Sequence, residues 1–188
     1  PDISRNGQAV TIQFTDFMVD VVPAFNRKGG GYLIPSSVTQ SWISTDPKSH
    51  VDIWTTENEK HDGDLIPLIK MVKAWNSEIG YYFHNFHLEV VTLQVLKGVT
   101  ISDFASGIRY VFDKCRSYVR KKNPDPAGYS EDVGSYLNTQ GKLDDAESRF
   151  KTAYKRAVKA EDFDRRGYVE EAVAEWRKVF GDCFPTYG

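Results

Sequence analysis

The chain has few of the residues on which the common catalytic and metal-binding motifs depend. It contains two cysteines, Cys115 and Cys183, which stand far apart and form no CxxC pair. No signal peptide is recognised, so the simplest interpretation is two reduced thiols in a cytosol. The four histidines show no HxxxH or HExxH spacing, so no zinc site is expected. The P-loop, GxGxxG and GxSxG motifs are absent, which argues against the commonest nucleotide-binding and hydrolase classes.

Long apolar runs and a strong charge imbalance are also lacking. The longest apolar run is far too short to span a membrane. The net charge is −2 and the pI is about 6.1, which gives no sign of constitutive polyanion binding. The 188 residues are enough for one sizeable core, or for one large domain with an appended lobe. The sequence starts at Pro1 without an initiator Met, and we expect it to be a piece of a longer protein.

The first third of the chain has the pattern of β-structure. Apolar residues alternate with polar ones over 10–14, and a second apolar run covers 17–22, which together predict a β-hairpin. A flexible loop is expected at 26–31, where three glycines follow one another. Short strands are predicted at 32–35 and 38–43, and a helix is predicted from Asp46-Pro47 to about Lys60.

The remaining two thirds have the pattern of α-helices. A run from Asp64 to Asn76 is apolar on almost every face, which predicts a buried central helix. Further helices are expected at 86–96, at 101–119 with the box Thr100-Ile101-Ser102-Asp103 at its start, and over two C-terminal segments, of which the last ends at Gly181. The order of elements predicts an α+β fold, with a β-rich part followed by a helical lobe.

Asp20 is a carboxylate within the apolar run Phe17 to Phe25. In a strand it shares a face with Met18 and Val22, so we expect it to be buried. Burying an ionised carboxylate costs several kcal/mol unless a cation or hydrogen-bond donors compensate. Asp20 is therefore either a ligand of a catalytic metal, or an Asp at a strand end that accepts bonds from nearby backbone N–H groups.

Lys70 and Lys73 lie three residues apart on one edge of the most apolar helix. Both ammonium groups must reach solvent or an anion. One interpretation is that they extend to the surface along their aliphatic stems. The other is that they present a cation to a nucleoside triphosphate, for which a point charge suffices.

The segment His84-Asn85-Phe86-His87 begins the next helix. Free backbone N–H groups, the amide of Asn85 and the ring of Phe86 would suit a phosphate and a stacked base. The alternative is that Asn85 is an ordinary N-cap and Phe86 an ordinary core residue.

Three of these runs occur in an order that resembles a known family: Val19 to Phe25, then Leu68 to Asn76, then Asn85 to Glu89. They resemble the nucleotidyltransferases of the oligoadenylate synthetase and cyclic GMP–AMP synthase superfamily, most closely the bacterial CD-NTases. Tyr32 to Pro35, Trp42 to Pro47 and Trp176 to Pro185 are also similar to that family. The resemblance implies that 1–62 is the C-terminal part of a polymerase β-like nucleotidyltransferase core, and that 63–188 is a helical domain with a spine helix.

The resemblance also implies roles for four residues. Asp20 would be the third metal-binding carboxylate of a catalytic triad, with Mg²⁺, or alternatively Mn²⁺, as cofactor. Lys73 would contact the triphosphate of the donor nucleotide. Asn85 would take the place of a polar residue near the phosphates or base, and Phe86 that of an aromatic residue, often Tyr, that stacks on the base.

The expected activity is that of a cytoplasmic enzyme of antiphage signalling. It would join NTPs (ATP, GTP or both) into cyclic or linear oligonucleotide second messengers and release pyrophosphate. A regulatory protein or a nucleic-acid activator is a further expected partner, and no membrane is expected.

One departure from the family limits this expectation. The Gly-Ser signature and the two strand carboxylates that follow it in the family are absent from the chain. The chain therefore resembles the C-terminal portion of the enzyme, and alone it is expected to be inactive because two Mg²⁺ ions cannot be held. Two alternatives are a catalytically dead module that binds nucleotides or RNA, and a helical interaction domain without a ligand.

Overall fold

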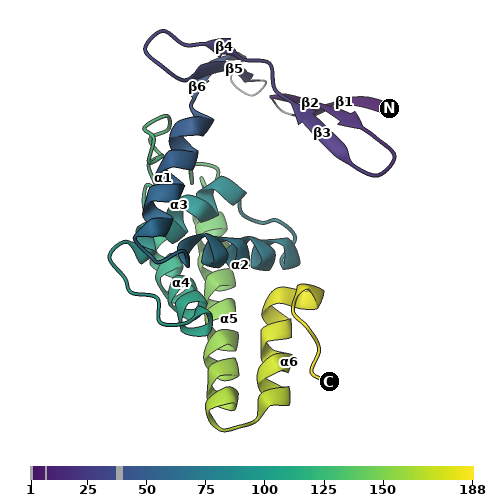
Figure 1. Cartoon of the computed structure of the whole chain (residues 1–188), viewed down its shortest axis with the longest axis vertical. Helices are drawn as coiled ribbons and strands as arrows, with labels where there is room; N and C mark the ends of the chain where they lie inside the picture. The colour runs from purple at the N-terminus through teal and green to yellow at the C-terminus, as the bar shows by residue number, and fades with distance from the viewer. Residues whose placement is uncertain (1, 7, 37–39) are drawn as a thin grey trace. The chain divides into compact units, whose positions relative to one another are not determined.

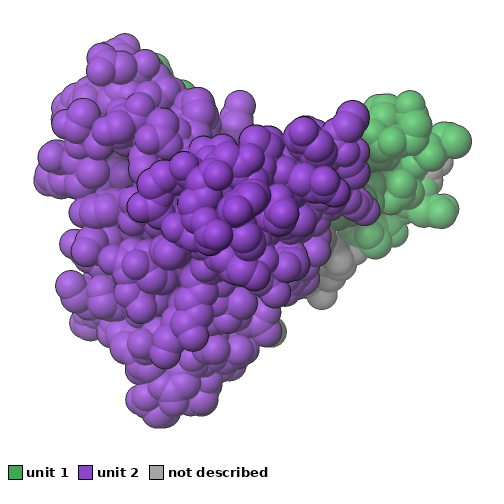
Figure 2. All heavy atoms as spheres, turned by 90° about the horizontal axis from the view of Figure 1, so that it is seen from below, with its two compact units in different colours: residues 1–53 green, residues 54–188 purple. Residues whose placement is uncertain are grey.

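The computed structural model describes residues 2–6, 8–36 and 40–188. The chain forms two compact units, residues 1–53 and residues 54–188 (Figure 2). The first unit consists mainly of antiparallel strands and the second of helices (Figure 1), so the predicted α+β class is confirmed. The domain limits of 1–62 and 63–188 that the resemblance implies stay a prediction.

The first sheet of the β-rich unit contains the predicted hairpin. Its strands are β1 (Asp2–Asn6), β2 (Ala9–Gln13) and β3 (Met18–Val21), paired antiparallel in that order. The register of β2 and β3 places Thr11 opposite Asp20. The turn between them is tight, since the Phe14 N–H donates to the Phe17 carbonyl at 2.8 Å and the two rings stack with their centroids 4.7 Å apart. Strand β1 was not placed by the sequence pattern.

The second sheet is formed by β4 (Phe25–Asn26), β5 (Tyr32–Ser36) and β6 (Ser41–Thr45), again antiparallel and in chain order. The predicted glycine loop joins β4 to β5. Gly29 and Gly30 have φ angles of 95° and 106°, which residues with a Cβ rarely adopt. The strand expected at 38–43 falls partly on residues 37–39, which lie outside the described residues.

Helix α1 (Pro47–Glu59) begins as the sequence predicts. The carboxylate of Asp46 accepts the Ser49 N–H at 3.2 Å and the Ser49 hydroxyl at 2.7 Å. Proline at the first helical position costs nothing, because its missing N–H would be unpaired in any residue there.

Besides the end of α1, the helical unit contains five α-helices, which surround an aromatic core. Trp75 is 2% exposed, and its ring centroid lies 4.7 Å from that of Phe150 and 5.2 Å from that of Phe112. The long helix α5 packs against both α4 and α6 (Figure 1). The helices are α2 (Leu65–Glu78), α3 (Asn85–Leu96), α4 (Phe104–Tyr118), α5 (Gln140–Arg165) and α6 (Val169–Phe180), followed by a 3-10 turn at Gly181–Cys183.

Two helix ends show how local chemistry sets the boundaries. Helix α4 starts later than the sequence pattern indicates, because the capping residue is Asp103 at the end of the predicted box. Its carboxylate accepts the Ser106 N–H at 2.8 Å. Helix α6 ends at Gly181, which has a φ of 60°, as predicted. Within the described residues, no helix has both the length and the apolar character needed to cross a bilayer.

Candidate nucleotide-binding site

Lys73 forms the centre of a polar cluster on the surface of α2 and α3. Its ammonium lies 2.8 Å from Oε1 of Glu89, and the other oxygen of Glu89 accepts the indole N–H of Trp54 at 3.1 Å. The Lys73 side chain is 37% exposed and that of Glu89 only 19%. We call Trp54, Lys73 and Glu89 the Glu89 cluster. The two lysines differ in what their ammonium groups reach. Lys70 extends to the surface, whereas Lys73 contacts an anion of the protein itself, the carboxylate of Glu89.

A second polar bridge next to the Glu89 cluster joins the same two helices. The amide of Asn76 donates to Oδ1 of Asn85 at 3.3 Å. Asn76 follows Lys73 by three residues on α2, and Glu89 follows Asn85 by four on α3, so each pair shares one face of its helix. The two bridges run in opposite order along the chain, which shows that α2 and α3 are antiparallel. The structure therefore brings Lys73 and Asn85 to adjacent positions of one surface.

Asn85 and Phe86 are the first two residues of α3, but Asn85 is not its N-cap. The capping position belongs to His84, whose backbone is extended and whose side chain makes no capping bond. Asn85 is the first helical residue and is exposed, so the idea that Asn85 is an ordinary N-cap is wrong. Phe86 follows it and is half-buried.

The buried histidine His87 holds the loop after α4 onto the start of α3. It is 1% exposed, and its Nδ1 lies 2.9 Å from the Tyr136 hydroxyl. The amide nitrogen of Asn123 approaches Nε2 at 3.3 Å. Burial lowers the pKa of His87 to about 4, so the ring is neutral at pH 7, and burial raises the pKa of Tyr136 to about 12.

The same tyrosine supports the residue before Asn85. The Tyr136 hydroxyl accepts the backbone N–H of His84 at 3.1 Å, and the two rings stack with centroids 3.8 Å apart. The start of α3 is therefore fixed both by Tyr136 and by the Asn76–Asn85 bond.

Asp20 lies in the other unit, and its predicted burial is wrong. All four residues of β3 are exposed, and Met18 is 67% and Val22 42% exposed. The carboxylate accepts a hydrogen bond from the hydroxyl of its cross-strand neighbour Thr11. The desolvation that suggested a metal is therefore absent from this structure.

The carboxylate of Asp20 is suited to be one ligand of a magnesium site, but it cannot form such a site alone. Mg²⁺ prefers hard oxygen donors such as carboxylates, and a single carboxylate holds it poorly. Among the residues that the structure describes, no group of three or more His, Cys, Asp or Glu side chains is arranged to hold a metal. Asp20 therefore fits as a contributor to a site with several carboxylates.

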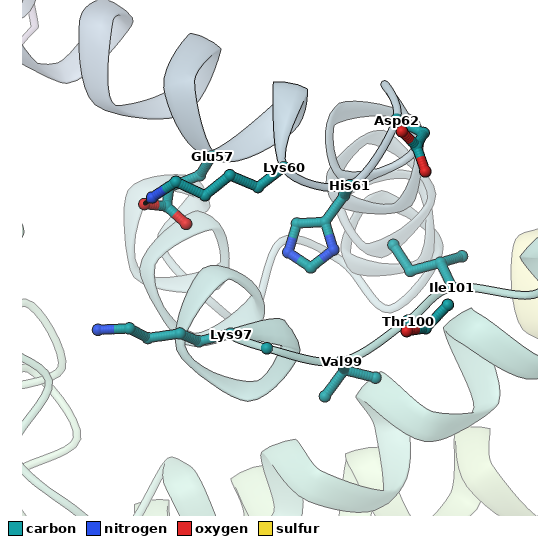
Figure 3. Close-up of a pocket in the computed structure, with 9 residues that line it drawn as sticks. Glu57, Lys60, His61, Asp62, Lys97, Val99, Thr100 and Ile101 are labelled. Carbon is teal, nitrogen blue, oxygen red and sulfur yellow. Dashed lines mark hydrogen bonds and ion pairs between the residues drawn. The ribbon is translucent and has the colours of Figure 1, made fainter.

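A cavity of about 460 Å³ lies elsewhere in the helical unit, between the end of α1 and the connection from α3 to α4 (Figure 3). The imidazole of His61, which is 8% exposed as a residue, points into it. The ammonium of Lys60 on its rim is paired with Glu57 at 2.6 Å. None of the four predicted site residues lines this cavity.

No role was predicted from the sequence for Trp54, Asn76, Glu89 or Tyr136. The available signal for Glu89 was a carboxylate three residues after Phe86, on a helix that has no other Asp, Glu, Lys or Arg. An amide near the end of the apolar helix α2 was the signal for Asn76. Trp54 and Tyr136 are far from α3 in sequence, and no local pattern connects them with it.

Comparisons with known proteins agree along most of the chain. A family model described as the Second Messenger Oligonucleotide or Dinucleotide Synthetase domain (SMODS) matches residues 1–58. A probable cyclic nucleotide synthase of Bacillus cereus (strain VD146) is 27% identical over 194 residues, which cover 99% of this chain and 58% of the relative. A cyclic AMP-AMP-AMP synthase of Acinetobacter sp. is 28% identical over 192 residues, which cover 98% of this chain and 55% of the relative.

Solved structures show the same fold. CdnC of E. coli MS115-1 with ATP superposes with a TM-score of 0.78 at 18% identity, over 97% of this chain and 66% of that one. CdnC in its complex with HORMA-deltaN gives a TM-score of 0.75 at 16% identity, over 97% of this chain and 65% of that one. The chain spans little more than half the length of the curated relatives that it matches.

Proposed function

Since the chain belongs to the CD-NTase family of nucleotidyltransferases, we propose that it is the C-terminal part of a Mg²⁺-dependent enzyme. This enzyme joins NTPs into cyclic or linear oligonucleotide second messengers and releases pyrophosphate. The observation that carries the proposal is the match of nearly the whole chain to two cyclic nucleotide synthases. Because the chain spans 58% and 55% of them, the activity is assigned to the parent protein and not to these 188 residues.

Lys73 is proposed to bind the triphosphate of the donor nucleotide. Its side chain is partly exposed and lies at the surface of two packed helices, so its ammonium can donate to phosphate oxygens. Asn85, one helical turn before Glu89, offers an exposed amide near the same position. Phe86 offers an aromatic face for a base, with stacking worth about 1–3 kcal/mol per base.

Asp20 is proposed to hold Mg²⁺ together with carboxylates outside this chain. When bound, Mg²⁺ would neutralise the charge that develops on the phosphoryl oxygens. In the reaction, a ribose hydroxyl oxygen forms a bond to the α-phosphorus and the bond to pyrophosphate breaks. The protein contributes position and electrostatics, and no residue of this chain forms a covalent intermediate.

The names of the relatives guide the choice of substrate and partner. ATP is the first nucleotide to test, because one relative is a cyclic AMP-AMP-AMP synthase and one neighbouring structure contains ATP. A regulatory protein partner is also proposed, since CdnC forms a complex with HORMA-deltaN. We further propose a role in antiphage signalling in the cytoplasm.

The test is synthesis from ATP and MgCl₂ by the parent protein, followed by chromatography of the products. Asp20→Asn should lower the rate at least about 100-fold, because one metal ligand is lost. Lys73→Met should raise the KM for ATP, whereas Lys70→Met, three residues away on the same helix and exposed, should not. The 188-residue chain alone should give no product.

Two results would contradict the proposal. Product from the chain alone at the rate of the parent protein would refute the proposal that it is an inactive part. ATP binding by the parent protein without any turnover would identify the catalytically dead binding module instead.

A further inference from the structure

The two oxygens of Glu89 serve two different donors. Oε1 accepts from the Lys73 ammonium at 2.8 Å, and Oε2 accepts from the Trp54 indole at 3.1 Å. Indole N–H is a donor only, so it fixes the orientation of the carboxylate and turns Oε1 toward Lys73. The Glu89 side chain is about four-fifths buried, which limits the water that could replace either bond.

This arrangement cancels the charge of the one lysine that is proposed to bind phosphate. In the free protein, an approaching nucleotide meets a neutral Lys73–Glu89 pair rather than a lone cation. A phosphate oxygen must compete with Oε1 for the ammonium, and the Glu89 carboxylate repels the phosphate. Because Lys73 is more than a third exposed, the pair is of moderate strength and can open.

We propose that Glu89 is a specificity-determining residue that competes with nucleotide phosphates for Lys73. Binding of a triphosphate draws the ammonium away from Glu89, and departure of pyrophosphate returns it. The competition therefore weakens the binding of both ATP and pyrophosphate, and it favours release of the pyrophosphate product. This inference rests on the proposed role of Lys73 in binding phosphate.

The test compares binding by the parent protein and its variants, measured by titration calorimetry with ATP, pyrophosphate and AMP in EDTA, so that no turnover occurs. Glu89→Gln keeps the shape of the side chain and removes its charge. It should bind ATP and pyrophosphate about fivefold more tightly, as expected for loss of a competing ion pair of moderate strength. AMP lacks the terminal phosphates, so the affinity for AMP should change less than twofold.

A matched control is Glu57→Gln, which neutralises another Glu–Lys pair of the same unit, with Lys60 at 2.6 Å. It should leave all three affinities unchanged. In the Lys73→Met background, Glu89→Gln should lose most of its effect on ATP, because the two residues act as a pair. Melting curves of every variant check that the fold is kept.

The outcomes separate the two levels of the hypothesis. If Lys73→Met leaves ATP affinity unchanged, the proposed role of Lys73 fails. If Lys73→Met weakens ATP but Glu89→Gln leaves it unchanged or weaker, Lys73 binds phosphate and the competition by Glu89 is refuted.

Discussion

The side-chain amide of Asn76 binds both polar groups of the Phe83 backbone. It donates to the Phe83 carbonyl at 2.8 Å and accepts the Phe83 N–H at 3.0 Å. Asn76 is completely buried and Phe83 is 2% exposed, so water cannot replace these bonds. Asn76 therefore closes the connection between α2 and α3 just before the proposed nucleotide-binding residues.

Replacing Asn76 should destabilise the protein and disturb the start of α3. Asn76→Ala leaves a buried N–H and a buried carbonyl without partners, at a cost of about 2–4 kcal/mol. Urea unfolding followed by circular dichroism measures this cost. Asn138→Ala, at an exposed position, is the control and should change the unfolding free energy by less than about 0.5 kcal/mol. A loss below 1 kcal/mol for Asn76→Ala would contradict this account.

His87 should make the stability of the protein depend on pH. The groups that face it are Asp132, His84, Tyr136 and Asn123, and burial dominates, so its pKa falls to about 4. In the unfolded chain the pKa is near 6.5, so between pH 6.5 and 4 the unfolded state binds more protons. The contribution of His87 to the unfolding free energy should therefore be fully present above pH 6.5. It should be lost as the pH drops toward 4, which lowers the unfolding free energy by up to about 3 kcal/mol.

The measurement is the unfolding free energy at several pH values between 7.5 and 4.5. His87→Gln should be less stable at pH 7, but its unfolding free energy should depend clearly less on pH. An identical slope in the two proteins would show that other groups cause the dependence.

Gly134 should not tolerate a side chain. A Cβ there would lie 2.9 Å from Nε2 and 3.0 Å from Cε1 of His87, and that ring is held by Tyr136 and Asn123. Gly134→Ala should therefore cost about 1–3 kcal/mol. Gly141→Ala is the control, since a Cβ at this position in the first turn of α5 meets no atom within 4 Å. It should be neutral or stabilising in thermal melts.

The two thiols should react very differently. Cys183 is exposed, whereas Cys115 is 0% exposed and burial raises the pKa of its thiol far above the ordinary range. A maleimide should label Cys183 within minutes and Cys115 only after unfolding. Mass spectrometry of digests locates the label, and rapid modification of Cys115 in the native protein would contradict its place in the core.

Most of the architecture could be predicted from local sequence patterns. The alternation over Val10–Phe14 and the apolar spacing of the helices identify the hairpin and the helical lobe because each element buries one face. Strand β1 was missed, because its residues Asp2–Asn6 have no alternation of apolar and polar side chains. The cap is Asp103 rather than Thr100, because the Asp103 carboxylate accepts both the N–H and the hydroxyl of Ser106.

The predicted site depended on partners that a local pattern does not reveal. Asp20 was expected to be buried from its apolar neighbours, but exposure depends on what packs against the sheet. The partner of Lys73 is sixteen residues away, at Glu89, and is oriented by Trp54 from another helix. Such contacts follow from the packing of helices and become visible only in the folded structure.

Strand β3 is an outer strand of its sheet in the described part of the chain, and its apolar side chains are open to solvent. Such an edge is a template on which a second copy can add a strand, which leads to aggregation. Asp20 lies within this edge, and its negative charge opposes a like-charged copy that pairs there. Asp20→Asn would remove that protection, so light scattering must show that the variant is monodisperse before a loss of activity is attributed to metal binding.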